Sequence, residues 1–368
     1  MPAEVAIIGA GPAGLATDAC LRANGIAFRL LDRTGEPGGA YRSIYPNTVL
    51  ASPVVHSVLP GFSPAHADEY ITAGRYLEYL RAYADHHRLV VERADVERLE
   101  RSRGRFVLRE ADREREARAV VVATGMFGFP RPVTLAGTPT VPVLHSRDWR
   151  GPADLPPGDV LVIGGGNSAV EVAEEAATAG RRVFLVSRTP LRFTRQRLFG
   201  RDVHDVLPVL EWIPTWAARG FCARPPTFRP VDLGFARLRD RGQISVHSGL
   251  VRVDGDRVRF RSGDERCESP GWGPRRPARR GGAEPRGIDE ARVAAIVYAT
   301  GYQFLTPFVP PEVARAPAGH LRARANESVT WSGLFVVGAP CARGLASEFL
   351  RGIARDAARL PHRISDAG

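Results

Sequence analysis

Two glycine-rich turns are the parts of this sequence whose residue types and spacing are best suited to chemistry. The first turn carries Gly9, Gly11 and Gly14 in the pattern G-x-G-x-x-G. A glycine turn at the start of a helix lets a pyrophosphate approach the backbone, where free amides and the helix dipole hold it. Asp32 ends the next apolar stretch, where a carboxylate can accept hydrogen bonds from a ribose diol. These residues predict a dinucleotide site suited to FAD.

The second turn, with Gly164, Gly166 and Ala169, differs from the first in its third residue and at the end of its second apolar stretch. Ser187 and Arg188 stand where the first unit has an acid. A carboxylate there would repel a 2′-phosphate, whereas a hydroxyl and a guanidinium would bind it, so we predict an NADPH site. The chain contains no lysine, and a solvated basic face is the alternative interpretation for the other arginines of this region, which are Arg181, Arg182, Arg192, Arg195, Arg197 and Arg201.

The residues around each turn indicate the elements that must hold it. Each turn lies between a short apolar strand and a helix that a glycine ends, and a second apolar strand comes next. The strands are Val5–Ile8 and Phe28–Leu31 in the first unit, and Val160–Ile163 and Val183–Val186 in the second. This order is typical of a parallel βαβ unit. Two such units predict an α/β fold with two Rossmann-like dinucleotide-binding domains.

The positions of these units predict the domain layout. We expect residues 1–150 and 295–368 to form a discontinuous FAD-binding domain, into which an NADPH-binding domain of residues 151–294 is inserted. The segment 263–287, rich in Arg, Pro and Gly, has the composition of a mobile surface insertion. Periodicity predicts helices at Tyr70–His87 and Ala346–Arg363, and antiparallel strands at Arg93–Leu99, Arg105–Glu110 and Ala117–Ala123.

Further motifs, taken with the two turns, resemble those of one superfamily. Gly38-Gly39-Ala40-Tyr41 is similar to the segment beside the flavin, and Leu334–Gly338 resembles the third FAD segment. Ala123-Thr124-Gly125 and Ala299-Thr300-Gly301 resemble paired ATG motifs. The chain thus resembles the two-dinucleotide-binding-domain flavoproteins over nearly its whole length. Within them it is most similar to bacterial flavin-containing monooxygenase-like proteins, which the segment Val143–Trp149 supports.

The resemblance implies which residues bind the two cofactors, FAD and NADPH. They are Gly9, Gly11, Pro12, Ala13, Gly14, Asp32, Arg33, Gly39, Ala40, Tyr41, Thr124, Gly125, Gly164, Gly166, Asn167, Ser168, Ala169, Ser187, Arg188, Thr300, Gly301 and Gly338.

The activity that the resemblance implies is a monooxygenation. NADPH would reduce FAD, O₂ would add to form a C4a-hydroperoxyflavin, and one oxygen atom would pass to a small organic substrate. Ser52, His56 and His145 are the candidate residues beside the substrate, and a hydrogen-bonded structural role is the alternative for each histidine. The monooxygenase fingerprint F-x-G-x-x-x-H keeps His145 but has Pro139 and Val141 at its first two fixed positions.

Two other functions remain open from the sequence. Ser43-Ile44-Tyr45 and the helix after it resemble bacillithiol-disulfide-reductase-like proteins, which favours an NADPH-dependent reductase of a disulfide, a quinone or a carrier. A nucleotide-binding sensor without catalysis is the third. The four cysteines, Cys20, Cys222, Cys267 and Cys341, lie far apart with no C-x-x-C pair, so we expect reduced thiols and no intrinsic dithiol centre.

Composition excludes several classes of protein. With 44% hydrophobic and 25% charged residues, the chain is neither disordered nor fibrous. The net charge of +11 would suit a polyanion, but no nucleic-acid-binding motif accompanies it, so no nucleic-acid partner is expected. No apolar stretch approaches the roughly 20 residues of a membrane span, and the N-terminus does not resemble a signal peptide. We therefore expect a cytoplasmic enzyme with a small-molecule substrate and O₂ as partners, either monomeric or a homodimer.

Overall fold

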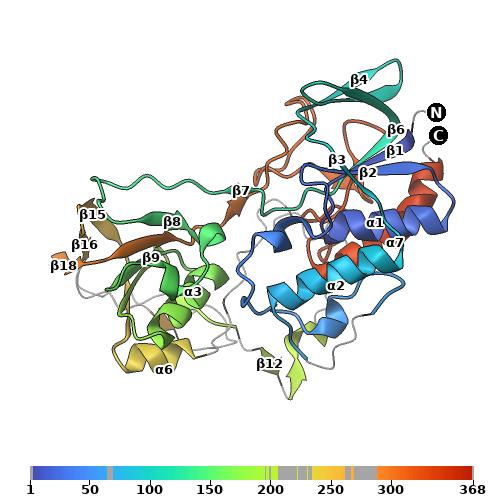
Figure 1. The fold of residues 1–368 in the computed structure, drawn as a ribbon. Coiled ribbons are helices and arrows are strands. Elements are labelled where there is room, and N and C mark those ends of the chain that lie inside the picture. The colour runs from blue at the N-terminus through green and yellow to red at the C-terminus, as the bar shows by residue number, and fades with distance from the viewer. Residues whose placement is uncertain are drawn as a thin grey trace.

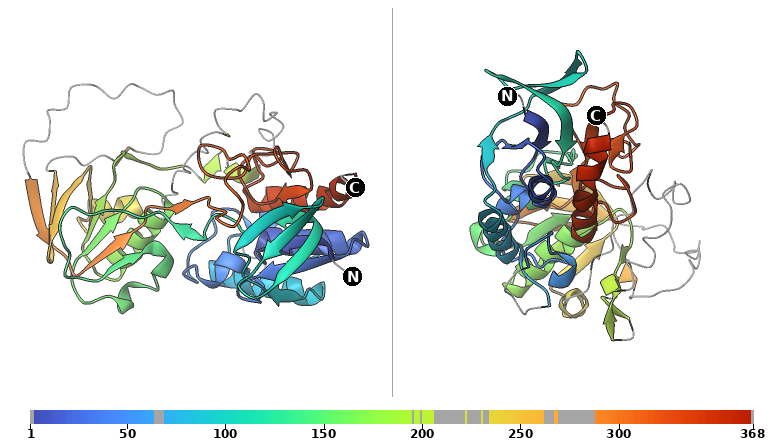
Figure 2. Two further views of the ribbon diagram at one scale, coloured as in Figure 1. Left: turned by 90° about the horizontal axis from the view of Figure 1, so that it is seen from above. Right: turned by 90° about the vertical axis from the view of Figure 1, so that its right-hand side faces the viewer.

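A computed structural model gives the fold of the chain as two lobes, each built on its own sheet (Figure 1). It describes residues 3–63, 69–194, 196–198, 200–205, 222, 230, 234–261, 267–268 and 288–366. Both termini lie on the lobe that carries the first glycine turn, and the other lobe is inserted between its segments (Figures 1 and 2). The predicted α/β fold class, with two Rossmann-like domains of which one is inserted into the other, is confirmed.

The first sheet is built around the first predicted βαβ unit. Strand β1 (Ala3–Ile8) leads through the turn into helix α1 (Pro12–Ala23) and strand β2 (Phe28–Asp32). Ile7 pairs with Leu30 on one side and with Val121 on the other, both in parallel register. The remaining strands on the main path are β3 (Val91–Arg93), β6 (Glu114–Val122), β21 (Ala323–Arg324), β22 (Glu327–Ser328) and β23 (Leu334–Val336), in the order β21-β22-β23-β6-β1-β2-β3.

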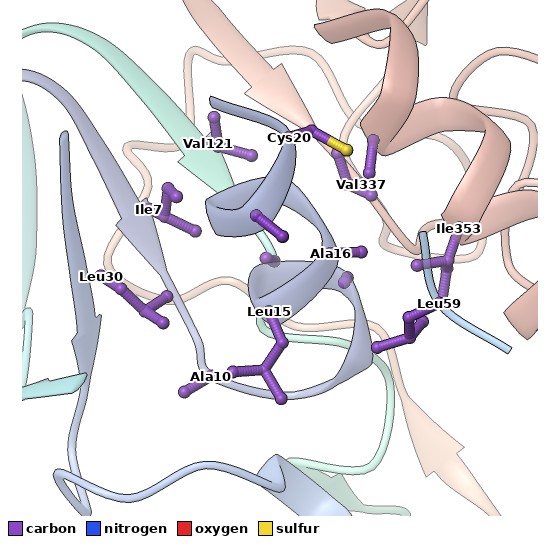
Figure 3. Packing of buried hydrophobic residues seen from close by; sticks show 14 of the residues in the cluster. Ile7, Ala10, Leu15, Ala16, Cys20, Leu30, Leu59, Val121, Val337 and Ile353 are labelled. Carbon is purple, nitrogen blue, oxygen red and sulfur yellow. The ribbon is translucent and has the colours of Figure 1, made fainter. Parts of the chain in front are cut away.

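Alternating side chains of β1 enter two separate cores. Val5 and Ile7 face the helices α1, α2 (Ala73–His86) and α7 (Leu350–Asp366), where Leu15 and Ile353 also pack (Figure 3). Ala6 and Ile8 enter a core on the other face, which includes side chains of β4 (Arg98–Ser102) and β5 (Arg105–Arg109). Because both faces are covered, β1 is apolar from Val5 to Ile8, as a central parallel strand requires.

The second sheet has the order β14-β10-β9-β19-β8, and each of its pairs is parallel. Helices α3 (Asn167–Thr178) and α6 (Phe235–Asp240) cover one face, and a three-stranded antiparallel sheet covers the other. The strands of the main sheet are β8 (Val143–His145), β9 (Val160–Ile163), β10 (Val183–Val186), β14 (Ile244–His247) and β19 (Ala295–Tyr298), and those of the covering sheet are β15 (Leu250–Asp254), β16 (Arg257–Arg261) and β18 (Ile288–Arg292).

Small paired segments complete the fold. Strand β7 (Phe129–Pro130) pairs antiparallel with β20 (Tyr302–Gln303), where the chain passes between the lobes in both directions. Strand β12 (Arg197–Leu198) forms a hairpin with β13 (Arg201–Asp202), and β11 (Leu191–Arg192) pairs with β17 (Cys267–Glu268). Short 3₁₀ helices lie at Gly39–Arg42, Val54–His56, Ser146–Asp148 and Pro152–Asp154.

The sheet pairing bears on the predicted boundaries at residues 150 and 295, which otherwise remain a prediction. Strands β8 and β19 flank those boundaries, yet β19 pairs with both β8 and β9 inside the second sheet. We therefore propose that the domains meet at the paired crossings β7 and β20. The insertion expected at 263–287 lies outside the described residues apart from 267–268.

Two local expectations need correction. The strand predicted at Arg93–Leu99 begins later, as β4 (Arg98–Ser102), because its register is set by pairing with β5. Cys222 and Cys341 are joined by a disulfide with their Cα atoms 5.6 Å apart, so the expectation of reduced thiols is wrong for this pair. They are 119 residues apart in sequence, and spacing alone could not bring them together.

Candidate functional site

The three glycines of the first turn do different physical work. A Cβ on Gly14 would lie 1.8 Å from the carbonyl oxygen of Gly9, so this position lets α1 pack against the turn. Gly9 has φ +106°, and a Cβ there would lie 2.6 Å from the carbonyl oxygen of Ala123. A Cβ on Gly11 would meet only the Cα of Gly39, at 3.8 Å. Gly11 is therefore the glycine that keeps the mouth of the turn open.

Asp32 is fixed by hydrogen bonds at the end of β2. One carboxylate oxygen accepts from the amide of Ala10 at 2.9 Å, and the other accepts from the amide and the hydroxyl of Thr34 at 2.9 and 2.6 Å. The side chain is half-buried and lines the same opening as Gly11. A carboxylate held in this way is oriented before a ligand arrives, as recognition of a ribose diol requires.

The second glycine turn resembles the first in its backbone contacts, but its third residue is an alanine. A Cβ on Gly164 would lie 2.2 Å from the carbonyl oxygen of Ala299, so this glycine again allows a close backbone approach. Nothing lies within 4 Å of a Cβ on Gly166, which is the open position. Ala169 is fully buried against the turn. This unit therefore accommodates a methyl group at the position where the first unit has Gly14.

The two residues directly after β10, Ser187 and Arg188, are both predicted to bind a 2′-phosphate, and the structure shows that they differ in availability. The buried Ser187 hydroxyl donates to the carbonyl of Thr189 at 2.7 Å, so it already has a partner within the protein. Arg188 is exposed and lines the cavity, and it forms no ion pair or hydrogen bond within the described part of the chain. Of the two, Arg188 is the group available to a 2′-phosphate.

Several neighbouring arginines have structural partners instead. Arg181 donates to the carbonyls of Pro152, Leu155, Pro156 and Gly158, which fixes the segment before β9. The guanidinium of Arg182 lies over the ring of Phe184, at 4.9 Å from its centroid. Arg197 forms an ion pair with Glu69 across the two lobes. Arg195 lies outside the described residues.

Both turns open into one cavity of about 2680 Å³. Its lining includes every predicted cofactor residue except Gly14 and Ala169, which are packed behind their turns: Gly9, Gly11, Pro12, Ala13, Asp32, Arg33, Gly39, Ala40, Tyr41, Thr124, Gly125, Gly164, Gly166, Asn167, Ser168, Ser187, Arg188, Thr300, Gly301 and Gly338. The cavity therefore joins residues from both lobes, although their individual roles stay predictions.

The three candidate catalytic residues differ in whether they line the cavity. Ser52 lines the cavity, whereas His56 and His145 do not. His56 forms a 2.8 Å contact with Asp205 through Nε2. His145 accepts the amide hydrogen of Arg147 on Nδ1 at 3.0 Å, and burial lowers its pKa. Both histidines thus have a contact within the protein, and their roles stay predictions.

Sequence reasoning missed several polar residues of the cavity. Gln196, His204 and Glu348 line it, and burial raises the pKa of Glu348 to about 7. His204 lies near the start of the region 203–233, which is rich in aromatic and proline residues and is mostly outside the described residues. No sequence motif marks these three positions.

The residues present fit a flavin dinucleotide in the first turn and a phosphorylated nicotinamide dinucleotide in the second. The open positions Gly11 and Gly166 leave room for a pyrophosphate, and the ribose end of each site carries Asp32 or Arg188. Within the described residues no group of three His, Cys, Asp or Glu side chains could hold a metal ion. None of the described helices is long and apolar enough to cross a membrane.

This fold and this pair of sites define a two-dinucleotide-binding oxidoreductase. The family model of pyridine nucleotide-disulphide oxidoreductases matches residues 6–203, and the chain belongs to this family. A curated relative from Geobacillus kaustophilus, an uncharacterized oxidoreductase CzcO-like, is 30% identical over 204 residues, which are 54% of this chain and 58% of the relative. The chain spans only a little more than half of the first curated relatives it matches.

Solved structures are similar over the whole chain. A flavin-containing monooxygenase from Stenotrophomonas maltophilia superposes with a TM-score of 0.73 at 22% identity, covering 100% of this chain and 99% of that one. The bacillithiol disulfide reductase Bdr from Bacillus cereus superposes with a TM-score of 0.72 at 18% identity, covering 100% of both. At these identities the likeness establishes the fold, and it does not separate an oxygenase from a reductase.

Proposed function

We propose that the protein is an FAD- and NADPH-dependent monooxygenase that adds one oxygen atom from O₂ to a small organic substrate. The observation that carries this proposal is the single cavity, which runs from Asp32 in one lobe to Arg188 in the other. A continuous space lets a reduced nicotinamide and a flavin meet, with room left for a substrate. The curated relatives that include flavin-containing monooxygenase 1 of Sus scrofa support the same class.

Each part of the chain then has a task in binding. The amides around Gly11 and Gly166 hold the two pyrophosphates, Asp32 orients the FAD ribose, and Arg188 pairs with the 2′-phosphate. When bound, FAD takes electrons from NADPH and supplies the chemistry that activates O₂. Aromatic side chains that line the cavity would limit the entry of water beside the flavin: Phe127, Phe129, Phe304, Phe308 and Phe349.

An NADPH-dependent reductase is the second candidate. The similarity in fold to the bacillithiol disulfide reductase Bdr supports this reductase. The cysteines restrict the form it could take. Cys222 and Cys341 pair with each other, Cys20 is buried, and none of the three lines the cavity. A reductase built on these residues would pass electrons from the flavin to an external acceptor.

The experiment that distinguishes the monooxygenase from the reductase measures both NADPH oxidation and the fate of the oxygen atoms. Protein loaded with FAD is supplied with NADPH and ¹⁸O₂ together with thioanisole, benzylamine or cyclohexanone, and oxygenated product, NADPH and H₂O₂ are all measured. We expect at least one of these substrates to gain a single ¹⁸O for most of the NADPH consumed. If all the NADPH oxidised is recovered as free H₂O₂, and a disulfide or quinone restores turnover without O₂, the reductase is correct instead.

A further inference from the structure

A polar cluster joins the two lobes beside the cavity, and none of its members belongs to the two glycine turns or to the residues predicted at their ribose ends. It is carried by the hairpin of β12 and β13, which contacts the first lobe at several points. Gln196 donates to the carbonyl of Ala51 at 3.1 Å, and Arg197 forms an ion pair with Glu69. Tyr70 of the first lobe donates its hydroxyl hydrogen to Asp202.

Asp202 is the centre of this cluster. Its side chain is only 3% exposed. Besides the Tyr70 hydroxyl, it accepts hydrogen bonds from Gln196 and from the His204 amide, each at 2.7 Å. Burial alone would raise the pKa of Asp202, but the hydrogen bonds from Tyr70, the His204 amide and Gln196 outweigh it and hold the pKa below its usual value. Asp202 is therefore an ionised carboxylate at neutral pH.

The carboxylate fixes the state of the His204 ring. Nδ1 of His204 lies 2.7 Å from an oxygen of Asp202. Because an ionised carboxylate only accepts, the hydrogen between them belongs to Nδ1, and Nε2 keeps its lone pair. Nε2 forms no hydrogen bond with any described residue, and the ring lines the cavity with 12% of its side chain exposed. A basic nitrogen is thus available to whatever the cavity holds.

The groups around His204 keep it neutral yet able to accept a proton. Burial lowers its pKa, Asp202 raises it, and the charges of Arg351 on α7 and of His56 on the first lobe lower it further. Asp205 pairs with His56 rather than with His204. A neutral imidazole with a carboxylate behind it is the arrangement of a general base, because the carboxylate stabilises the imidazolium that forms.

We propose that His204 is a general base that removes a proton from protonated amine substrates, with Asp202 and Tyr70 as its positioning residues. This inference rests on the proposed function and names the substrate class for which the base is needed. A primary amine with the pKa of about 10.4 of a lysine side chain is neutral in about one molecule in a thousand at pH 7.4, and only the neutral form has a lone pair to accept oxygen. The N–H bond of the ammonium breaks, its electron pair stays on nitrogen, and the proton moves to Nε2.

A thioether has no proton to lose, and this difference gives the test. His204→Asn keeps an N–H donor toward Asp202 but has no basic nitrogen. We expect kcat/KM for benzylamine to fall about 100-fold at pH 7, within the range for general bases, while that for thioanisole changes little. The loss should disappear above pH 10, where benzylamine is already neutral. His56→Asn, which removes the neighbouring contact to Asp205, should affect both substrates by the same factor. Equal losses for both substrates in His204→Asn, or no loss for benzylamine, would overturn the proposal.

A measurement without turnover separates failure of this inference from failure of the proposed function. In ¹⁵N-labelled protein, the imidazole signals should show His204 neutral at pH 7 with hydrogen on Nδ1, and bound benzylammonium should shift the Nε2 signal by donating a hydrogen bond to that nitrogen. Asp202→Asn should move the hydrogen to Nε2. A protein that oxygenates nothing yet shows these signals has the base without the proposed reaction. A His204 that is already charged, carries hydrogen on Nε2 or does not respond to benzylammonium refutes the base itself.

Discussion

The two βαβ units of this chain are close repeats in topology, and they differ where a cofactor would be distinguished. In both, a Cβ on the first glycine would lie 2.6 Å or less from a neighbouring carbonyl oxygen, so no side chain fits there, and the second glycine faces open space. The third position is Gly14 in one unit and Ala169 in the other. At the ribose end the first unit has Asp32, held by three hydrogen bonds, and the second has Arg188 with no described partner.

This difference shows which parts of a repeated unit are fixed by packing and which are free to specify a ligand. The packing glycines cannot change without moving a helix or a neighbouring backbone. The residue at the end of the second strand meets solvent and ligand, so its charge can change with little effect on the fold. Substitutions at matched positions of the two units test that division, beginning with the largest expected effect.

Replacing the third residue of each turn should destabilise the protein much more in the first unit than in the second. Gly14→Ala places a Cβ 1.8 Å from the carbonyl oxygen of Gly9, so α1 must move, and we expect a destabilisation of about 3 kcal/mol with loss of bound FAD. Ala169→Gly removes a methyl group from a helix start and should cost about 1 kcal/mol. Thermal unfolding and flavin content of the two purified variants provide the comparison. Equal stability of Gly14→Ala and the parent protein would show that α1 does not pack as closely as described.

Replacing the open glycine should remove one cofactor without unfolding the protein. A Cβ on Gly11 meets only the Cα of Gly39 at 3.8 Å, so Gly11→Val should fold but lose FAD, since its side chain enters the space for the pyrophosphate. Gly166→Val is the matched variant, and it should keep FAD while the KM for NADPH rises at least tenfold. Absorbance of the flavin and NADPH titrations distinguish the two. A folded Gly11→Val with a full complement of FAD would mean that the first turn does not hold this cofactor.

The sequence was informative where the relevant contacts are local. Each βαβ unit lies within about thirty residues, and its apolar runs and glycine turns predict the strands and helices to within a few residues. Strands β8 and β19 could not be assigned to the second sheet in this way, because they are about 150 residues apart and pair only after folding. The same holds for the disulfide between Cys222 and Cys341.

The residues of the candidate site also differ in whether local sequence could predict them. Apart from Gly14 and Ala169, the motif residues of the two turns line the cavity, and their roles in binding stay predictions. His204 carries no motif, and its environment depends on Tyr70, which is 132 residues away from Asp202 in sequence. His56 was chosen by residue type and His145 by its place in the monooxygenase fingerprint, and the structure gives each a partner within the protein. Residue type suggests a chemical group, whereas burial and partners decide whether that group is available.

The charge at the end of the second unit should set the choice between NADPH and NADH. Arg188→Ala removes a guanidinium that can form charge-assisted hydrogen bonds to a 2′-phosphate, so a preference for NADPH of roughly 10- to 150-fold should largely disappear. The change should come from a higher KM for NADPH, with NADH turnover nearly unaltered. Arg182→Ala is the control, because that arginine packs on Phe184 and should not affect selectivity. Equal use of both cofactors by the parent protein would show that Arg188 is only a surface charge.

The smallest expected effect is a pH dependence of stability, and it comes from a difference between the helices that follow the two turns. Helix α1 pairs its buried Asp18 with Arg22, whereas α3 carries Glu171, Glu174 and Glu175 within about one turn of helix. Burial is the main cause that raises the pKa of Glu171 to about 7, and the two neighbouring carboxylates add to it.

The sign of the resulting pH dependence is set by this shift. The folded protein keeps the Glu171 proton between pH 4.5 and 7, where the unfolded chain releases it, so this group's contribution to stability is lost as pH rises through 7. Glu171→Gln has no such loss, and after allowance for partial exposure it should gain about 1–2 kcal/mol over the parent protein between pH 5 and pH 8. Thermal unfolding of both FAD-loaded proteins at several pH values measures this gain. A difference in Tm that stays constant with pH would show that Glu171 is already ionised in α3, and that the second helix tolerates its three charges through solvent alone.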